Sequence, residues 1–237
     1  MPIRLNQARP PLGDLPFAYE LRLSDRRRTL ALEVAAGKVV VRAPRQADPH
    51  YIASFVQSRQ AWVMEKLGLQ QQRLTEVPVR GYQTGEKLPY LGCDYELIVS
   101  RSSVAGVRLQ GGQLHLCLPA RASPEAALRH WYRAQARQIL QAKTDACALR
   151  LGVTVTDLTL RQTRTKWGHC TRSGRIQYNW LIILAPEPVV DYLVAHEVSH
   201  RLHLNHSAAF WQTVASLCPE FQQWRQWLRR YGHTLAL

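Results

Sequence analysis

The sequence of 237 residues has no long hydrophobic run and few cysteines. Its longest strongly apolar run, from Trp180 to Ala185, is far too short to cross a lipid bilayer. No apolar segment follows the first four residues, so we do not read them as a signal peptide. The 5 cysteines are scattered, without a C-x-x-C pair, which excludes a disulfide framework and favours a reducing compartment. These absences predict a cytoplasmic protein with no membrane span.

Acidic residues are also scarce. There are 17 Asp and Glu against 31 Lys and Arg, giving a formal net charge of +14. Lysine is rare as well, with 5 Lys against 26 Arg, which codon usage in a GC-rich genome explains. Codon usage does not explain the excess of positive charge. Because a basic surface attracts polyanions, the charge leaves a nucleotide or nucleic-acid partner open.

One segment has the spacing of a metal site: His196-Glu197-Val198-Ser199-His200, an H-E-x-x-H sequence in an apolar, helix-like stretch. Residues four apart share a helix face, so His196 and His200 can reach one ion. Glu197 lies about 100° further round the helix, where its carboxylate can take a proton from a metal-bound water. Two His ligands and a Glu base form the core of a zinc hydrolase.

His206 is the favoured third ligand. His200 and His206 follow His196 by four and ten residues, as in zinc proteases with three histidines. A straight helix would carry His206 about 9 Å further along the axis and onto another face. The helix must therefore end near His203 or Asn205, and Asn205 can turn the chain in a left-handed conformation.

Other ligands are less suitable. His203 lies close to His200 on the same helix face and cannot easily supply a third tetrahedral corner. Glu220 has the spacing of a thermolysin-type ligand, but it follows Pro219 and fits better in the first turn of a helix. His169 and Cys170 are adjacent and have no partners nearby in the sequence.

The order of patterns divides the chain into an irregular arm (1–16), a β-rich region (17–120) and a catalytic α+β region (121–237). In the β-rich region we expect a three-stranded antiparallel meander over 17–44, a helix capped by Asp48 and ended by Gly68, and a strand over 90–100. The pattern of residues 107–118 predicts a hairpin with a two-glycine turn.

The catalytic region begins with a long helix that Ser123 opens and Gly152 closes. Strands are expected over 157–162 and 175–183, and the H-E-x-x-H helix begins after Pro186 or Pro188. One further helix starts near Ser207, and the last covers about 220–231.

A basic segment precedes the helix predicted for the H-E-x-x-H sequence. Residues 161–175 carry five positive charges, and no acid occurs between Asp157 and Glu187. The strand that follows leads into the metal helix, and in zinc proteases a strand at this place pairs with extended substrate. Arg164 and Lys166 are the best candidates for holding a phosphate, a carboxylate or an oxyanion. A solvated basic loop is the plainer interpretation.

Four stretches carry a family resemblance: Lys166–Cys170, Gln177–Trp180, Asp191–His200 and Asn205–Trp211. They resemble the YgjP-like family of metal-dependent hydrolases, in the zincin superfamily and near the SprT-like and Wss-type proteases. The family commonly has Ser where this chain has His169. The resemblance implies a zincin-like catalytic domain in which three histidines bind the metal and one glutamate is the base: His196, His200 and His206, with Glu197. The candidate substrate-binding residues are Arg164, Lys166, Trp167 and Asn179.

We therefore expect an α+β zinc-dependent hydrolase, and favour a metallopeptidase that uses Zn²⁺ and acts on a peptide or protein. A nucleotide phosphohydrolase is the first alternative; the basic segment favours it, but no carboxylate-rich Mg²⁺ site is evident. A DNA-associated protease of SprT-like type is the second, although no zinc-finger or helix-turn-helix signature accompanies the charge. A purely structural zinc site would need no base beside its ligands.

Overall fold

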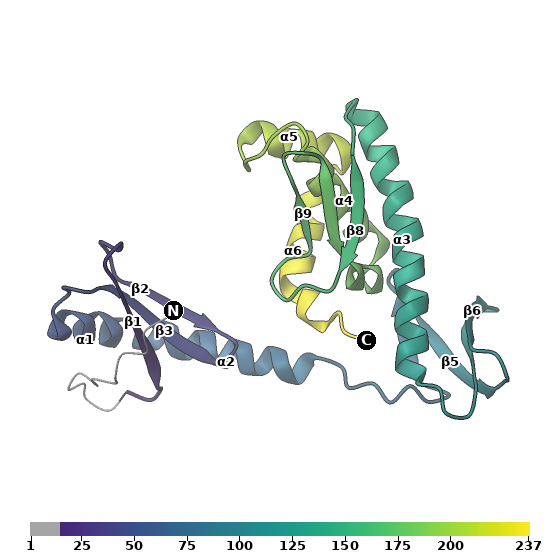
Figure 1. Cartoon of the computed structure of the whole chain (residues 1–237), viewed down its shortest axis with the longest axis horizontal. Coiled ribbons are helices and arrows are strands. Elements are labelled where there is room, and N and C mark those ends of the chain that lie inside the picture. The colour runs from purple at the N-terminus through teal and green to yellow at the C-terminus, as the bar shows by residue number, and fades with distance from the viewer. Residues whose placement is uncertain (1–14) are drawn as a thin grey trace. The chain divides into compact units, whose positions relative to one another are not determined.

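The computed structural model describes residues 15–237, and the predicted arm over 1–16 lies outside them except for its last two residues. The chain is a mixed α+β protein that divides into two compact units, Met1–Glu76 and Val77–Leu237 (Figure 1). The division falls at residue 76 and not at 120, because the strands after residue 87 pack into one core with the helices that follow. No helix in the described part of the chain has the length and apolar character of a membrane span.

The first unit holds β1 (Tyr19–Ser24), β2 (Ala31–Ala35) and β3 (Lys38–Pro44). The strand order is β1-β3-β2, with β3 parallel to β1 and antiparallel to β2. The predicted antiparallel meander is therefore wrong. The reason lies in β3, which buries Val39, Val41 and Ala43 and so takes the middle of the sheet.

Two helices cover this sheet: α1 (Pro49–Ser58) and α2 (Gln60–Glu76). The predicted cap is confirmed, since Asp48 Oδ1 accepts a hydrogen bond from His50 N at 2.9 Å. The predicted end at Gly68 is wrong. The helix is interrupted at Arg59 and then continues past Gly68, because Gln70 ties α2 to the sheet through Val34 O at 2.9 Å.

The second unit begins with a four-stranded sheet in the order β4-β5-β7-β6. Its strands are β4 (Lys87–Tyr90), β5 (Cys93–Arg101), β6 (Gly106–Gln110) and β7 (Gln113–Leu118). The two-glycine turn of the last hairpin is confirmed. The strand expected over 90–100 instead includes a turn at Leu91-Gly92, where both residues have positive φ (49° and 84°). Leucine seldom adopts this conformation, so the sequence concealed the turn.

Helix α3 (Pro124–Leu151) runs along the second unit (Figure 1). Both predicted ends are confirmed: Ser123 Oγ accepts from Ala126 N at 3.2 Å, and Gly152 adopts a left-handed φ of 64°. The side chains that α3 buries recur every fourth residue, and they are Leu128, Tyr132, Ala136, Leu140, Thr144 and Ala148. This spacing places them on one face of the helix.

The last sheet has the order β8-β10-β9, from β8 (Asp157–Arg161), β9 (Gly168–Cys170) and β10 (Arg175–Asn179). The strand expected to reach residue 183 ends at Asn179, because the Asn179 side chain caps the 3-10 helix η1 (Trp180–Leu184). Beyond it lie α4 (Glu187–Ser199), α5 (Ala208–Leu217), α6 (Phe221–Tyr231) and η2 (Gly232–Thr234). Helix α4 is largely buried in the core of this unit and contacts α3, α5, α6 and β9.

Candidate active site

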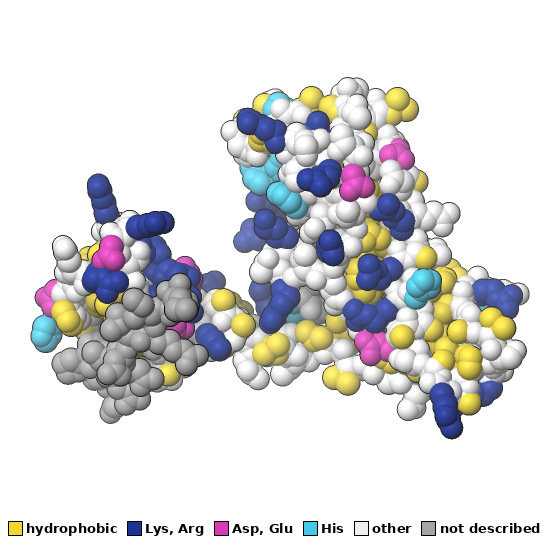
Figure 2. Space-filling view, viewed as in Figure 1, with side chains coloured by type: hydrophobic (Ala, Val, Ile, Leu, Met, Phe, Trp, Pro, Cys, Tyr) yellow, Lys and Arg dark blue, Asp and Glu magenta, His cyan; other side chains and the backbone are white. Residues whose placement is uncertain are grey.

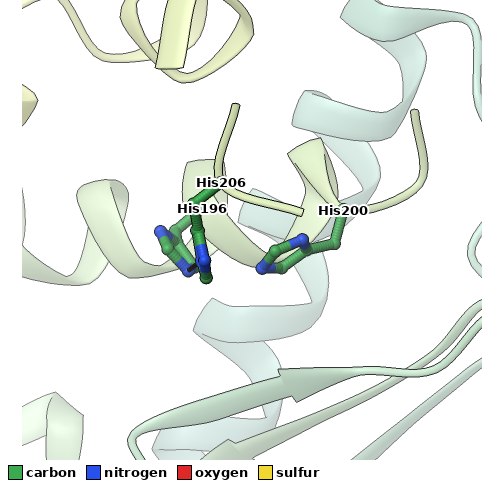
Figure 3. A group of neighbouring side chains, drawn as sticks. All are labelled: His196, His200 and His206. Atoms are coloured by element: carbon green, nitrogen blue, oxygen red, sulfur yellow. Dashed lines mark hydrogen bonds between the residues drawn. The ribbon is translucent and has the colours of Figure 1, made fainter. Parts of the chain in front are cut away.

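The rings of His196, His200 and His206 point toward one region (Figure 3). One ligand atom from each residue can be chosen so that all three lie within 4.8 Å of one another. Nε2 of His196 lies 3.2 Å from Nε2 of His206. Two nitrogens bound to one tetrahedral zinc ion at its usual bond length would lie about 3.3 Å apart. The three imidazoles therefore fit a small metal ion.

The chain turns immediately after α4 to bring His206 back. The helix ends at Ser199, a few residues earlier than expected, and His200 is its C-cap residue in helical conformation. Two short hydrogen-bonded turns follow, from Arg201 N to Val198 O at 2.9 Å and from Leu202 N to Ser199 O at 3.1 Å. The left-handed turn expected at Asn205 is wrong, since this residue does not have positive φ.

His203 contributes its backbone and not its imidazole to this arrangement. Its carbonyl oxygen lies 2.9 Å from His200 Nδ1. Because a carbonyl only accepts hydrogen bonds, Nδ1 must be the donor, and Nε2 of His200 keeps its lone pair for a metal. The His203 ring itself lies 3.2 Å from the hydroxyl of Thr213.

The other candidate ligands do not join the cluster. Among the residues that the structure describes, the group of ligands able to share one ion contains only the three histidines. Glu220 is exposed and lies at the start of α6. His169 is exposed on β9, next to the half-buried Cys170.

Burial disfavours a charge on two residues of the site, His196 and Glu197. Burial, together with His200 and His206, lowers the pKa of His196 to about 3, so its imidazole is unprotonated at neutral pH. Burial also raises the pKa of Glu197 to about 8, and the positive charge of Lys166 acts in the opposite direction. A cation held by the histidines would favour the ionised form of this carboxyl group.

Glu197 is 4% exposed, and no described residue donates a hydrogen bond to its carboxylate. The carboxylate oxygens are not fully enclosed, so a water can bind them beside the three imidazoles. A water bound there would be close to a metal held by the histidines.

Strand β9 lies directly against this glutamate. A Cβ atom built on Gly168 would lie 2.3 Å from Oε1 of Glu197, so only glycine leaves the carboxylate where it is. The sequence indicated no more than a turn at Trp167-Gly168. Its place beside the H-E-x-x-H helix comes from the antiparallel pairing of β9 with β10.

The candidate substrate-binding residues divide into two pairs. Arg164 and Lys166 are exposed, and their charged groups make no hydrogen bond or ion pair with a described residue. The carbonyl oxygen of Lys166 accepts a hydrogen bond from the Thr163 hydroxyl. Trp167 is half-buried, and its indole packs against Gly232. Asn179 is 4% exposed and binds backbone at both ends of its amide, donating to Thr163 O at 3.1 Å and accepting from Leu181 N at 3.2 Å. The side chains of Trp167 and Asn179 therefore hold the basic segment in place.

Two residues near the site were given no role from the sequence, although Trp211 ends one of the stretches that carry the family resemblance. Arg201 ties the end of α4 to the segments before β8 and after β9, donating to Thr154 O and Arg172 O at 3.0 Å each. The indole of Trp211 stacks on the imidazole of His206, with centroids 5.7 Å apart and an interplanar angle of 23°. Only the proximity of Trp211 to His206 in the sequence could have indicated its place.

Positive charge predominates on the surface of the second unit. Figure 2 shows Lys and Arg side chains over the visible face of residues 77–237, with few Asp or Glu among them. The segment 161–175 carries five positive charges and no acid.

Comparison with known proteins gives a family match and similarity to solved structures. Curated proteins contain no match to this sequence. The crystal structure of the metallopeptidase zymogen of Pyrococcus abyssi abylysin is similar at 16% identity and a TM-score of 0.36, covering 39% of this chain and 95% of that chain. Residues 28–231 match the family described as YgjP-like, metallopeptidase domain. The match includes the three histidines, Glu197 and the basic segment, so this protein belongs to the YgjP-like family of metallopeptidases.

Proposed function

We propose that this protein is a zinc-dependent peptidase with a zincin-like catalytic unit. His196, His200 and His206 bind the ion, and Glu197 is the general base. The observation that carries the proposal is the convergence of three imidazoles beside the largely buried side chain of Glu197, whose carboxylate has no hydrogen-bond donor among the described residues.

The donor set favours zinc. Imidazole nitrogens are typical zinc ligands, whereas Mg²⁺ and Ca²⁺ take oxygen ligands that this cluster lacks. Three protein ligands also leave a fourth tetrahedral position, which structural zinc sites fill with a fourth side chain and catalytic sites leave to water. A bound zinc ion supplies Lewis acidity, which lowers the pKa of a water ligand toward about 7 and polarises the scissile carbonyl.

The protein residues then have separate roles. Glu197 accepts the proton of the attacking water and delivers it to the amine that leaves. The His203 carbonyl holds the imidazole of His200 in the tautomer that presents Nε2. Gly168 lets the Glu197 side chain lie against β9 without displacement.

We also propose where the substrate binds. Strand β9 is at the edge of its sheet and contacts α4, so its outer backbone groups are available to an extended peptide. Arg164 and Lys166 lie in the loop that leads into this strand, and their charged groups have no partner among the described residues. We propose that these two side chains contact the substrate, while Trp167 and Asn179 position their loop.

A parallel screen tests this proposal. The purified protein is analysed for metal, then incubated with a mixed peptide library and, separately, with the nucleoside triphosphates, each with and without a chelator. We expect about one zinc per chain, peptide cleavage that the chelator abolishes and zinc restores, and no triphosphate hydrolysis. Hydrolysis of a triphosphate without cleavage of any peptide would replace the proposal with a nucleotide phosphohydrolase.

A further inference from the structure

One arginine lies beside the metal cluster, on the side that Trp211 forms. The Trp211 indole centroid is 5.7 Å from the ring centroids of both His196 and His206. The guanidinium carbon of Arg225, on α6, lies 4.5 Å from the centre of the same indole. A fixed positive charge is therefore separated from two of the proposed ligands by a single aromatic ring.

Among the described residues, the guanidinium of Arg225 contacts only the Trp211 ring. The side chain is exposed, and within residues 15–237 it neither donates a hydrogen bond nor pairs with an acid. Arg201 differs, because backbone carbonyls of Thr154 and Arg172 accept from its guanidinium. The contact with the Trp211 ring is not a hydrogen bond, so the N–H donors of Arg225 remain available.

The guanidinium of Arg225 carries a fixed positive charge beside the Trp211 ring. That charge would attract an anion placed next to it. A planar guanidinium matches a carboxylate best, since it can donate two parallel hydrogen bonds.

We infer that Arg225 binds a carboxylate of the peptide substrate and gives the enzyme a preference for peptides with an acidic group on the Trp211 side of the scissile bond. This inference rests on the proposed peptidase function. The carboxylate belongs either to an acidic side chain or to the C-terminus of the peptide, and both present the same planar anion. Trp211 holds the guanidinium in place through its ring face.

A structural role for Arg225 gives a different expectation. If its only role were to cover the indole of Trp211, removing it would lower the melting temperature and weaken all ligands alike. A carboxylate-binding role predicts a selective loss, in which acidic ligands weaken and otherwise identical neutral ligands do not.

The test uses peptide hydroxamates, which bind zinc, and titration calorimetry on the zinc-loaded protein. One pair of probes differs by Glu against Gln, and a second pair by a free against an amidated C-terminus. The variants are Arg225→Gln and, as a matched control, Arg229→Gln, which removes an exposed charge from the same helix.

We expect the wild type and Arg229→Gln to bind the acidic member of one pair about three- to tenfold more tightly than its neutral partner. Arg225→Gln should bind both members equally, and the pair affected identifies the source of the carboxylate. Equal binding by the wild type, or an unchanged preference in Arg225→Gln, would overturn the inference while leaving the metal site intact. Hydroxamate binding that survives His206→Ala, or no binding at all, would contradict the metal site and the inference together.

Discussion

A Cβ atom on Gly168 would lie 2.3 Å from Oε1 of Glu197 and 2.6 Å from its Cδ. Side chains in proteins do not approach this closely, so any side chain at position 168 would displace the Glu197 carboxylate from its place against β9. The two residues are 29 positions apart in the sequence (197 − 168), and the pairing of β9 with β10 brings them together.

We expect Gly168→Ala to lower turnover by about tenfold or more, because the added methyl group must displace the carboxylate from its position. Zinc content should remain near one per chain, since the histidines are not touched. Gly106→Ala is the control, because a Cβ there meets no atom within 4 Å. Equal activity of the two variants would show that the carboxylate tolerates the displacement.

His206→Ala should remove most of the bound zinc, and His203→Ala should retain it. His206 supplies an imidazole nitrogen to the cluster, whereas His203 acts through a carbonyl that alanine also has. Elemental analysis after dialysis gives the zinc content of each variant. Zinc lost from His203→Ala, or kept by His206→Ala, would mean that the third ligand has been assigned to the wrong residue.

Glu197→Gln should stabilise the metal-free protein above neutral pH. The folded pKa of Glu197, about 8, lies above its ordinary value of 4.5. Between these two pKa values the folded protein keeps a proton that the unfolded chain releases. The contribution of Glu197 to the free energy of unfolding is therefore full below pH 4.5 and is lost as pH rises toward 8. At pH 8 the wild type has lost roughly 4 kcal/mol of unfolding free energy in this way. Glutamine does not titrate, so the Glu197→Gln variant does not lose it.

Urea denaturation of chelator-treated protein between pH 5 and pH 8 measures this difference. The difference in unfolding free energy between Glu197→Gln and wild type should widen steadily with pH. The contributions of all other titrating groups cancel, because these groups are the same in both proteins. A constant gap would mean that the glutamate is already ionised in the folded metal-free protein.

Replacing both Arg164 and Lys166 by glutamine should raise KM for a cleaved peptide about three- to tenfold and leave zinc content and melting temperature unchanged. Arg121→Gln, an exposed charge outside the segment 161–175, is the comparison. The KM of a polyanionic substrate should also rise steeply with salt, and that of a neutral peptide should not. Unaltered kinetics in the double variant would leave the segment as solvated surface.

Much of the candidate site could be read from the sequence because its signals are local. His196, Glu197 and His200 lie within five residues on one helix, so their relative positions follow from helical geometry. The signals for the two ends of α3 are equally local, because single residues, Ser123 and Gly152, cap the helix. His206 required only that the helix end before it.

Long-range pairing could not be read in this way. The parallel pairing of β1 with β3 depends on which strand buries the most apolar side chains after collapse, and the turn at Leu91-Gly92 depends on a contact of Leu91 N with Ile183 O at 2.9 Å. The buried role of Asn179 had the same origin. Its amide spans two backbone segments that meet only in the folded chain.

The most direct test of the account is the turnover of zinc-loaded Glu197→Gln on a peptide that the wild type cleaves. Glutamine has nearly the same shape as glutamate but cannot accept the proton of the attacking water. We predict unchanged zinc content and folding, with turnover reduced by about 10²- to 10⁴-fold. Near-normal turnover by a fully metal-loaded Glu197→Gln protein would contradict the assignment of Glu197 as the base.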